Sequence, residues 1–173
     1  MTEANPQIQP DVMAALASYA DTVRRVCYLY LKHREDVEDV FQDVFIKYMQ
    51  RTEPFAKAEH EKAWIIRVTI NCCKDLVGSF WRNRVLPLNE DQLSVTPVES
   101  RGLMEAVLRL PEKERTAIYL FYYEGYAATE IAAMTKQKVN TVYSHLHRAK
   151  SRLRGYLEGI EGLDDEQSNQ AGV

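Results

Sequence analysis

The feature that most constrains the fold of this chain is the spacing of its apolar residues, which recur at three- and four-residue steps in almost every segment. Between positions 36 and 49 they are Val37, Val40, Phe41, Val44, Phe45 and Tyr48. Residues at these steps lie on one face of an α-helix. The 7 glycines and 6 prolines among 173 residues are also few for a fold of many short strands and turns. We therefore expect an all-α protein.

The periodicity divides the chain into helices and one long interruption. It predicts helices at residues 11–32, 36–49, 61–81, 103–109, 112–124, 127–134 and 139–157. From Val85 to about Leu103 the periodicity is lost, and two prolines fall in this stretch. We expect two small helical domains joined by a flexible linker and followed by a disordered acidic tail. The expected bounds are 11–84 and 106–157 for the domains, 85–105 for the linker and 158–173 for the tail.

The net charge of −3 conceals an alternation of basic and acidic segments. Residues 57–84 carry +3 and residues 106–157 carry +5, whereas residues 85–105 carry −3 and residues 158–173 carry −5. Clustered basic residues are the electrostatic footprint of a polyanionic partner such as nucleic acid. Acidic segments repel such a partner and are typical of linkers, tails and protein-binding surfaces.

The sequence lacks membrane, export and metal-binding signals. Its longest apolar run, residues 117–123, is far shorter than the ~20 residues that a membrane span needs. The first ten residues have neither the basic start nor the apolar stretch of a signal peptide. The 3 cysteines offer neither a disulfide framework nor a CxxC metal pair. We expect a cytoplasmic protein with no membrane insertion, no metal and no cofactor.

The most specific motif lies at residues 126–154. It comprises a short apolar helix, a polar turn at 136–138, and a longer helix whose first turn Asn140 or Thr141 can cap through a side-chain oxygen. One face of the longer helix is apolar. Its opposite face carries Tyr143, Ser144, His147, Arg148, Lys150, Arg152 and Arg154. This arrangement fits the recognition helix of a helix-turn-helix motif in the DNA major groove, and a helical hairpin packed on a bundle is the alternative.

The sequence order E-I-A-x-x-x-x-x-x-V-x-T-V-x-S-x-L-x-R-A-x-x-R-L, from Glu130 to Leu153, resembles region 4 of bacterial RNA polymerase sigma factors. Upstream, residues 36–50 resemble region 2.2 and residues 63–77 resemble regions 2.3 to 2.4 of the same proteins. Only regions 2 and 4 are matched, with no region 3 between them. That layout resembles the small extracytoplasmic-function (ECF) group.

The resemblance implies a specificity subunit with no catalytic site of its own. It implies that core RNA polymerase is bound through the β′ clamp coiled coil and the β flap, that promoter DNA is read at the −35 and −10 elements, and that an anti-sigma factor masks the polymerase-binding surfaces. By position, the polymerase-binding residues are Asp36, Asp39, Gln42 and Asp43. The residues for the −10 element, which the family melts and reads with one base flipped out, are Phe55, Arg67, Asn71, Lys74, Trp81 and Arg82. The residues for the −35 element are Thr141, Tyr143, Ser144, His147, Arg148 and Arg152.

The sequence departs from the family pattern near the recognition helix. Lys136 stands where a glycine is usual in the turn, and Asn140 stands where a glycine is common. Asparagine tolerates a positive φ better than lysine does. Tyr143 and His145 occupy positions that are often basic. Fewer fixed charges imply a weaker attraction to phosphates and an altered −35 preference.

Two other functions stay open at the level of the sequence. One is a stand-alone helix-turn-helix regulator in which residues 1–84 sense a signal or dimerise. The other is an enzyme, for which we find no nucleophile–base pair, no glycine-rich phosphate loop and no metal cluster. Cys72 and Cys73 are the only reactive candidates, and burial in a helix competes with a redox role for them. Phe55 likewise fits a hydrophobic core as well as a base-stacking site.

Overall fold

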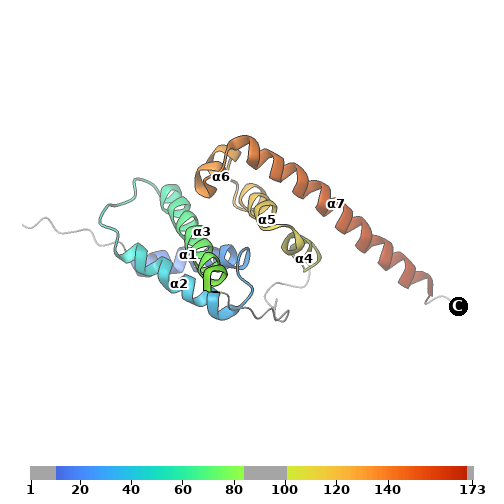
Figure 1. Cartoon of the computed structure of the whole chain (residues 1–173), viewed down its shortest axis with the longest axis horizontal. Coiled ribbons are helices and arrows are strands. Elements are labelled where there is room, and N and C mark those ends of the chain that lie inside the picture. The colour runs from blue at the N-terminus through green and yellow to red at the C-terminus, as the bar shows by residue number, and fades with distance from the viewer. Residues whose placement is uncertain (1–10, 84–100, 171–173) are drawn as a thin grey trace, which may run out of the picture. The chain divides into compact units, whose positions relative to one another are not determined.

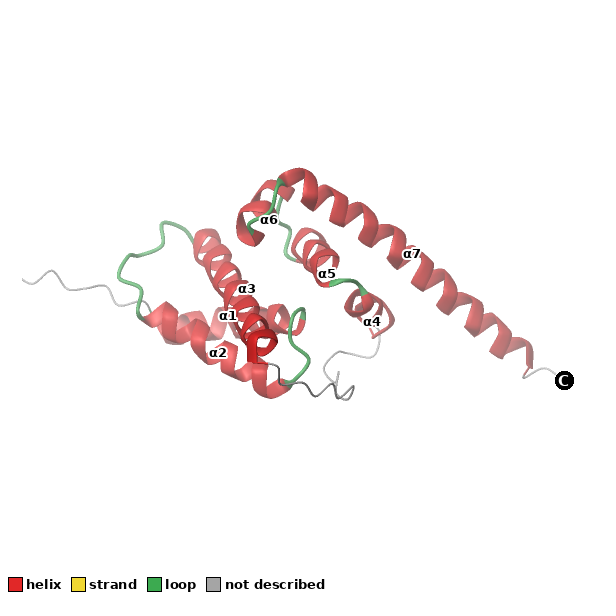
Figure 2. Ribbon diagram, viewed as in Figure 1, coloured by secondary structure: helices red, strands yellow, loops and turns green. Residues whose placement is uncertain are grey.

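The computed structural model describes the backbone of residues 11–83 and 101–170, and the side chains of residues 11–79, 103–156 and 158. Within these ranges every regular element is a helix, which confirms the expected all-α class (Figures 1 and 2). None of the described helices is both long and apolar enough to cross a membrane.

The chain divides into two compact units, residues 1–93 and 94–173. Most of the stretch that we expected to be a linker lies outside the described residues, so the expectation of flexibility there stays a prediction. The side chains of Trp81 and Arg82 are also outside the described part of the chain.

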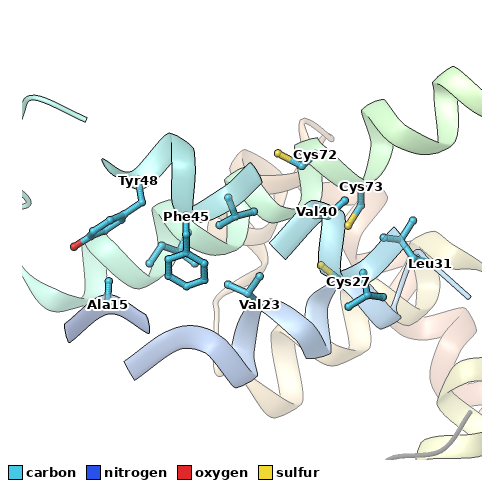
Figure 3. Close-up of a cluster of buried hydrophobic side chains, with 12 residues drawn as sticks. Ala15, Val23, Cys27, Leu31, Val40, Phe45, Tyr48, Cys72 and Cys73 are labelled. Carbon is cyan, nitrogen blue, oxygen red and sulfur yellow. The ribbon is translucent and has the colours of Figure 1, made fainter. Parts of the chain in front are cut away.

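The first unit consists of α1 (Val12–Tyr28), α2 (Arg34–Met49) and α3 (Ala58–Asn83). Asp11 starts α1, because its Oδ1 accepts hydrogen bonds from the amides of Met13 and Ala14, each at 3.1 Å. All three helices pack against one another and turn their periodic apolar residues inward. Figure 3 shows this core, in which all three cysteines of the chain are buried: Cys27 on α1, and Cys72 and Cys73 on α3.

Polar contacts connect the helices of the first unit at its surface. Arg24 on α1 donates two hydrogen bonds to the carboxylate of Glu38 on α2, at 3.1 and 3.3 Å. The carboxylate of Glu61, in the first turn of α3, accepts hydrogen bonds from the hydroxyls of Tyr19 and Tyr48. Burial, together with the adjacent Glu61 carboxylate, raises the pKa of both tyrosines. Glu61 therefore links the start of α3 to both other helices.

The second unit contains α4 (Arg101–Arg109), α5 (Glu112–Ile118), a π-helical turn (Tyr119–Tyr123), α6 (Ala128–Thr135) and α7 (Val139–Gln170). The long helix α7 packs against α4, α5 and α6. Its buried side, with Val142, Leu146 and Ala149, is the apolar face that the sequence predicted. The turn from α6 to α7 lies at residues 136–138, as expected for a helix-turn-helix motif.

Three local features of the second unit differ from the sequence-based expectations. The helix expected over 112–124 changes to π-helical geometry at Tyr119, where the rings of Tyr119 and Tyr123 stack with centroids 5.0 Å apart. α7 begins at Val139, so Asn140 and Thr141 lie inside its first turn and neither is its cap. α7 also continues past residue 157 to Gln170, because an existing helix extends at low cost when no proline interrupts it.

Candidate DNA-binding and polymerase-binding surfaces

Four of the six residues predicted to read the −35 element share one surface of α7. Tyr143, Ser144, His147 and Arg148 line a shallow depression, and all four are exposed. Their spacing of one, three and four residues brings them together on a helix. We refer to these four residues as the α7 outer face. It offers a phenol, a hydroxyl, an imidazole and a guanidinium, which are donors suited to phosphates and base edges.

Hydrogen bonds along the helix orient part of the α7 outer face. The hydroxyl of Ser144 donates to the carbonyl of Asn140 at 2.9 Å, and Nε of Arg148 donates to the carbonyl of Ser144 at 3.2 Å. The Nε contact holds the Arg148 guanidinium along the helix, and its terminal nitrogens make no hydrogen bond with other residues in the described part of the chain. Tyr143 is 57% exposed, which makes it a large aromatic contact surface without a covering partner in the described part of the chain.

The two other predicted −35 residues lie elsewhere. Nε of Arg152 is 3.1 Å from Oε2 of Glu114 on α5, within ion-pair distance although the pair is not aligned as a hydrogen bond. The Glu114 side chain is only 6% exposed, so the guanidinium compensates a buried carboxylate. Thr141 is half-buried in the first turn of α7. Sequence reasoning missed the pairing of Arg152, because Glu114 lies on a different helix.

His145 is the residue of α7 whose environment the sequence did not anticipate. It is buried, and neither of its ring nitrogens has a hydrogen-bond partner among the described residues. Burial lowers its pKa, the positive charge of Arg148 lowers it further, and the carboxylate of Glu114 partly opposes both effects. His145 is thus a buried imidazole on α7 whose neutral form is favoured.

On α3, three of the residues predicted for the −10 element lie on one face. Arg67, Asn71 and Lys74 follow one another at steps of four and three residues. Arg67 and Lys74 are exposed and Asn71 is half-buried. An amide between two cations can exchange hydrogen bonds with a base edge while its neighbours contact phosphates. We refer to these three residues as the α3 basic face.

Phe55, the predicted base-stacking residue of the loop before α3, packs against the chain itself. Its ring lies 5.7 Å from that of Trp64 and 6.2 Å from that of Tyr48, measured between centroids. The Arg51 guanidinium lies over it, with Cζ 4.1 Å from the ring centroid. Phe55 is therefore half-buried at the edge of the core, and its role in base stacking stays a prediction.

The predicted polymerase-binding residues lie on the solvent side of α2. Asp39, Gln42 and Asp43 are exposed, whereas Asp36 is half-buried and has a pKa raised mainly by burial. The same side carries Ile46 and Met49, which are 44% and 51% exposed. The sequence analysis missed Ile46 and Met49. They lie about one and two helical turns after Asp43, so two apolar residues on an otherwise polar face could have been recognised from the sequence.

The exposed residues of this side, Asp39, Gln42, Asp43, Ile46 and Met49, form what we call the α2 outer face. It combines two carboxylates with two large apolar side chains. Exposed apolar residues next to charges are typical of protein-binding surfaces rather than of solvated helix faces.

Comparisons with known proteins match both units. The family described as Sigma-70 region 2 matches residues 15–83, and the family described as Sigma-70, region 4 matches residues 100–153. In the first unit the match contains the α2 outer face and the α3 basic face. In the second unit it contains the α7 outer face.

Full-length relatives are sigma factors as well. The RNA polymerase sigma-E factor of Streptomyces antibioticus is 32% identical over 132 residues, covering 71% of both chains. The ECF sigma factor SigE of Mycolicibacterium smegmatis is 32% identical over 152 residues, but this chain spans only 58% of its length. SigW of Bacillus subtilis is 26% identical over 165 residues, covering 82% of this chain and 86% of the relative.

A solved structure shares the fold. The sigma factor RpoE of Bartonella quintana, in complex with the anti-sigma factor NepR, superposes with a TM-score of 0.67 at 20% identity, covering 86% of this chain and 97% of RpoE. This structural similarity, the sequence relatives and the two matched regions together identify the family of the chain. It belongs to the ECF group of RNA polymerase sigma factors, the proteins that direct promoter-specific transcription initiation.

Proposed function

We propose that this chain is a dissociable specificity subunit that brings core RNA polymerase to a set of promoters. The α2 outer face binds polymerase, the α3 basic face and the loop before it read the −10 element, and the α7 outer face reads the −35 element. The observation that carries the proposal is the presence of both sigma regions, in order, on one chain, each with an exposed face of matching chemistry. Polymerase performs the catalysis and this chain is no enzyme. We place it in the cytoplasm, where polymerase and promoter DNA are found.

The composition of the α2 outer face supports a protein partner. Burial of Ile46 and Met49 contributes binding free energy, at roughly 25 cal/mol per Å² of apolar surface. Asp39 and Asp43 add attraction to a basic surface, which affects the association rate and the orientation more than the affinity. The β′ clamp coiled coil of polymerase is the partner that the family resemblance implies for this face, and the β flap is the partner that it implies for the second unit.

We also propose that an anti-sigma factor holds this chain inactive. The solved relatives support this, since RpoE was captured with the anti-sigma factor NepR and CnrH with the cytosolic domain of CnrY. Exposed apolar residues on the α2 outer face give such an inhibitor a surface to cover. An inhibitor on this surface would exclude polymerase by direct competition.

The decisive experiment mixes the purified chain with core RNA polymerase, separates the complex by gel filtration at moderate salt, and then assays promoter-dependent transcription. We expect co-elution, and initiation at defined sites that core polymerase alone does not use. Asp39→Arg should reduce co-elution. Asp21→Arg, which reverses an exposed charge on α1, is the matched control and should not.

The alternative functions predict different outcomes. A stand-alone regulator would protect duplex DNA from nuclease without polymerase and would leave transcription start sites unchanged. If the chain elutes separately from core polymerase, mass spectrometry of the free peak would show whether a co-purified inhibitor occupies it. An inhibitor-free chain that neither binds polymerase nor redirects initiation would refute the proposal.

A further inference from the structure

The loop between α2 and α3, residues 50–57, is held by few backbone hydrogen bonds. The amide of Arg51 donates to the carbonyl of Tyr48 at 3.2 Å. Within the part of the chain that the structure describes, none of the amides of residues 52–56 donates a backbone hydrogen bond. One member of this stretch, Pro54, has no N–H to donate. The conformation of the loop therefore depends on side-chain packing.

Arg51 supplies the central contact of that packing. Its Cζ lies 4.1 Å from the ring centroid of Phe55 in the loop and 5.4 Å from that of Trp64 on α3. The rings of Tyr48 and Trp64 are 6.2 Å apart at an angle of 62°, so the aromatic contacts continue onto α2. We call Arg51, Phe55, Trp64 and Tyr48 the Arg51 stack. The cation thus attaches the loop to α3, and the ring of Tyr48 extends these contacts to α2.

The charge of Arg51 is not explained by ion pairing. No carboxylate lies within ion-pair distance of its guanidinium among the described residues, whereas Arg24 and Arg109 each have a glutamate partner. Its Nε is buried and has no hydrogen-bond partner in the same part of the chain. A buried donor without a partner is unfavourable unless another interaction compensates it. Here the faces of two aromatic rings provide that compensation.

We propose that Arg51 is a positioning residue for recognition of the −10 element. It holds Phe55 in one orientation and thereby fixes the loop that meets the unpaired base. This inference rests on the proposed function. A loop that is ordered before DNA arrives loses less conformational entropy on binding, and a fixed surface discriminates between bases better than a mobile one. A planar guanidinium suits this role because it lies flat on an aromatic ring, as an ammonium cannot.

The test measures base discrimination with holoenzyme assembled from core polymerase and each variant. The probe is a fluorescein-labelled single-stranded oligonucleotide that carries the −10 non-template strand of a promoter selected with the wild-type holoenzyme. Its affinity is compared with those of oligonucleotides in which each base is replaced in turn. The variants are Arg51→Met and Arg51→Lys. Lys57→Met is the matched control, because it removes the same charge from the same loop at an exposed side chain outside the Arg51 stack.

We expect Arg51→Met to lower the discrimination at one base position by roughly three- to thirtyfold, the range that a partly desolvated cation–π contact allows. Arg51→Lys should keep more of the discrimination than Arg51→Met does, because lysine retains the positive charge but lacks the planar guanidinium. Lys57→Met should weaken binding of all oligonucleotides alike and leave the affinity ratios within about twofold of the wild-type values. Co-elution with core polymerase should be unchanged in all three variants.

Two results would overturn the inference: wild-type affinity ratios in Arg51→Met, or an equal loss of affinity for every oligonucleotide in that variant. If circular dichroism shows that Arg51→Met does not fold, Arg51→Lys decides, and undiminished discrimination in it contradicts the inference. A wild-type holoenzyme without any base preference would instead refute the proposed reading of the −10 element itself. The failure of the inference and the failure of the function are therefore distinguishable.

Discussion

At the turn between α6 and α7, Lys136 adopts φ 56° and ψ 45°, in the left-handed region. The amide of the next residue, Gln137, donates to the carbonyl of Ala132 at 2.9 Å, which closes the helix with a Schellman-type hydrogen bond. This backbone geometry favours glycine, and a residue with a Cβ pays roughly 1–2 kcal/mol to adopt it. The departure from the family pattern noted in the sequence is thus a position of backbone strain.

Replacing Lys136 with glycine should stabilise the second unit. Relief of the left-handed strain outweighs the greater chain entropy of glycine in the unfolded state, and we expect a gain of about 0.5–1 kcal/mol. Urea unfolding followed by circular dichroism measures it. Lys136→Ala is the control, because it removes the charge and keeps the Cβ. Equal stability of the two variants would show that the lysine side chain, and not the backbone angle φ, accounts for the difference in the free energy of unfolding.

His145 connects stability to pH. In the folded protein its pKa is lowered, chiefly by burial, from an ordinary value of 6.5. Well above pH 6.5 the imidazole is neutral in both states and contributes no pH dependence. As the pH falls below this value the unfolded state binds the proton first, so the stability of the folded state decreases until the folded pKa is also passed. The charged neighbours Arg148, Lys113 and Glu114 do not reverse this direction.

We therefore expect the thermal midpoint of the wild-type second unit to fall between pH 7 and pH 5 by more than that of His145→Leu. Differential scanning calorimetry across this range measures the effect. An identical pH profile in wild type and His145→Leu would mean that the buried imidazole does not control acid stability.

At the scale of elements, α2 shows how one helix serves two purposes. Its inward residues, such as Val37 and Val44, are fully buried in the core of the first unit. Its outer face leaves Ile46 and Met49 exposed, although covering them would stabilise the chain. Exposure of large apolar side chains is explained if another protein covers them.

Ile46→Ser should weaken binding to core polymerase without unfolding the first unit. Loss of a partly buried isoleucine contact corresponds to about 1–2 kcal/mol, or roughly five- to thirtyfold in Kd. Fluorescence anisotropy of labelled chain titrated with core polymerase measures it. Met13→Ser, which replaces the exposed methionine of α1, is the control and should leave the affinity unchanged. Equal effects of the two substitutions would argue against the α2 outer face as the binding surface.

At the scale of the whole molecule, the proposed function requires two surfaces to contact one promoter. The α3 basic face belongs to the first unit and the α7 outer face to the second. Each phosphate contact releases condensed counterions, so its removal reduces the dependence of binding on salt. The effects of removing one phosphate contact on each face are expected to add.

Arg67→Met and Arg148→Met should each reduce the slope of log K against log salt concentration by about 0.7–0.9, and the double variant should reduce it by about twice as much. The measurement is holoenzyme binding to a selected promoter over a salt series. Lys32→Met removes an exposed charge at neither face and should leave the slope as in wild type. A double variant with the slope of one single variant would mean that the two faces do not contact DNA together.

Prediction from the sequence succeeded where the signal is local. The apolar periodicity predicted helices at 36–49 and 139–157 that the structure contains: α2 begins two residues earlier, at Arg34, and α7 begins at Val139 as predicted but continues to Gln170. The capping residue was predicted less well because capping depends on local geometry: Asn140 and Thr141 lie inside the first turn of α7 and do not cap it. The π-helical turn was missed, since a ring stack between Tyr119 and Tyr123 has no signature in the periodicity.

The sequence by itself determined the all-α class, the helix-turn-helix motif and the sigma-factor family, because helical spacing and linear motifs involve neighbouring residues. Only the tertiary structure decided how individual side chains are used. Arg152 pairs with Glu114, His145 is buried and Phe55 lies under Arg51, each through contacts between different elements. A side chain's partners are set by how helices and loops pack, and packing brings together residues whose separation in the chain carries no information about their contact.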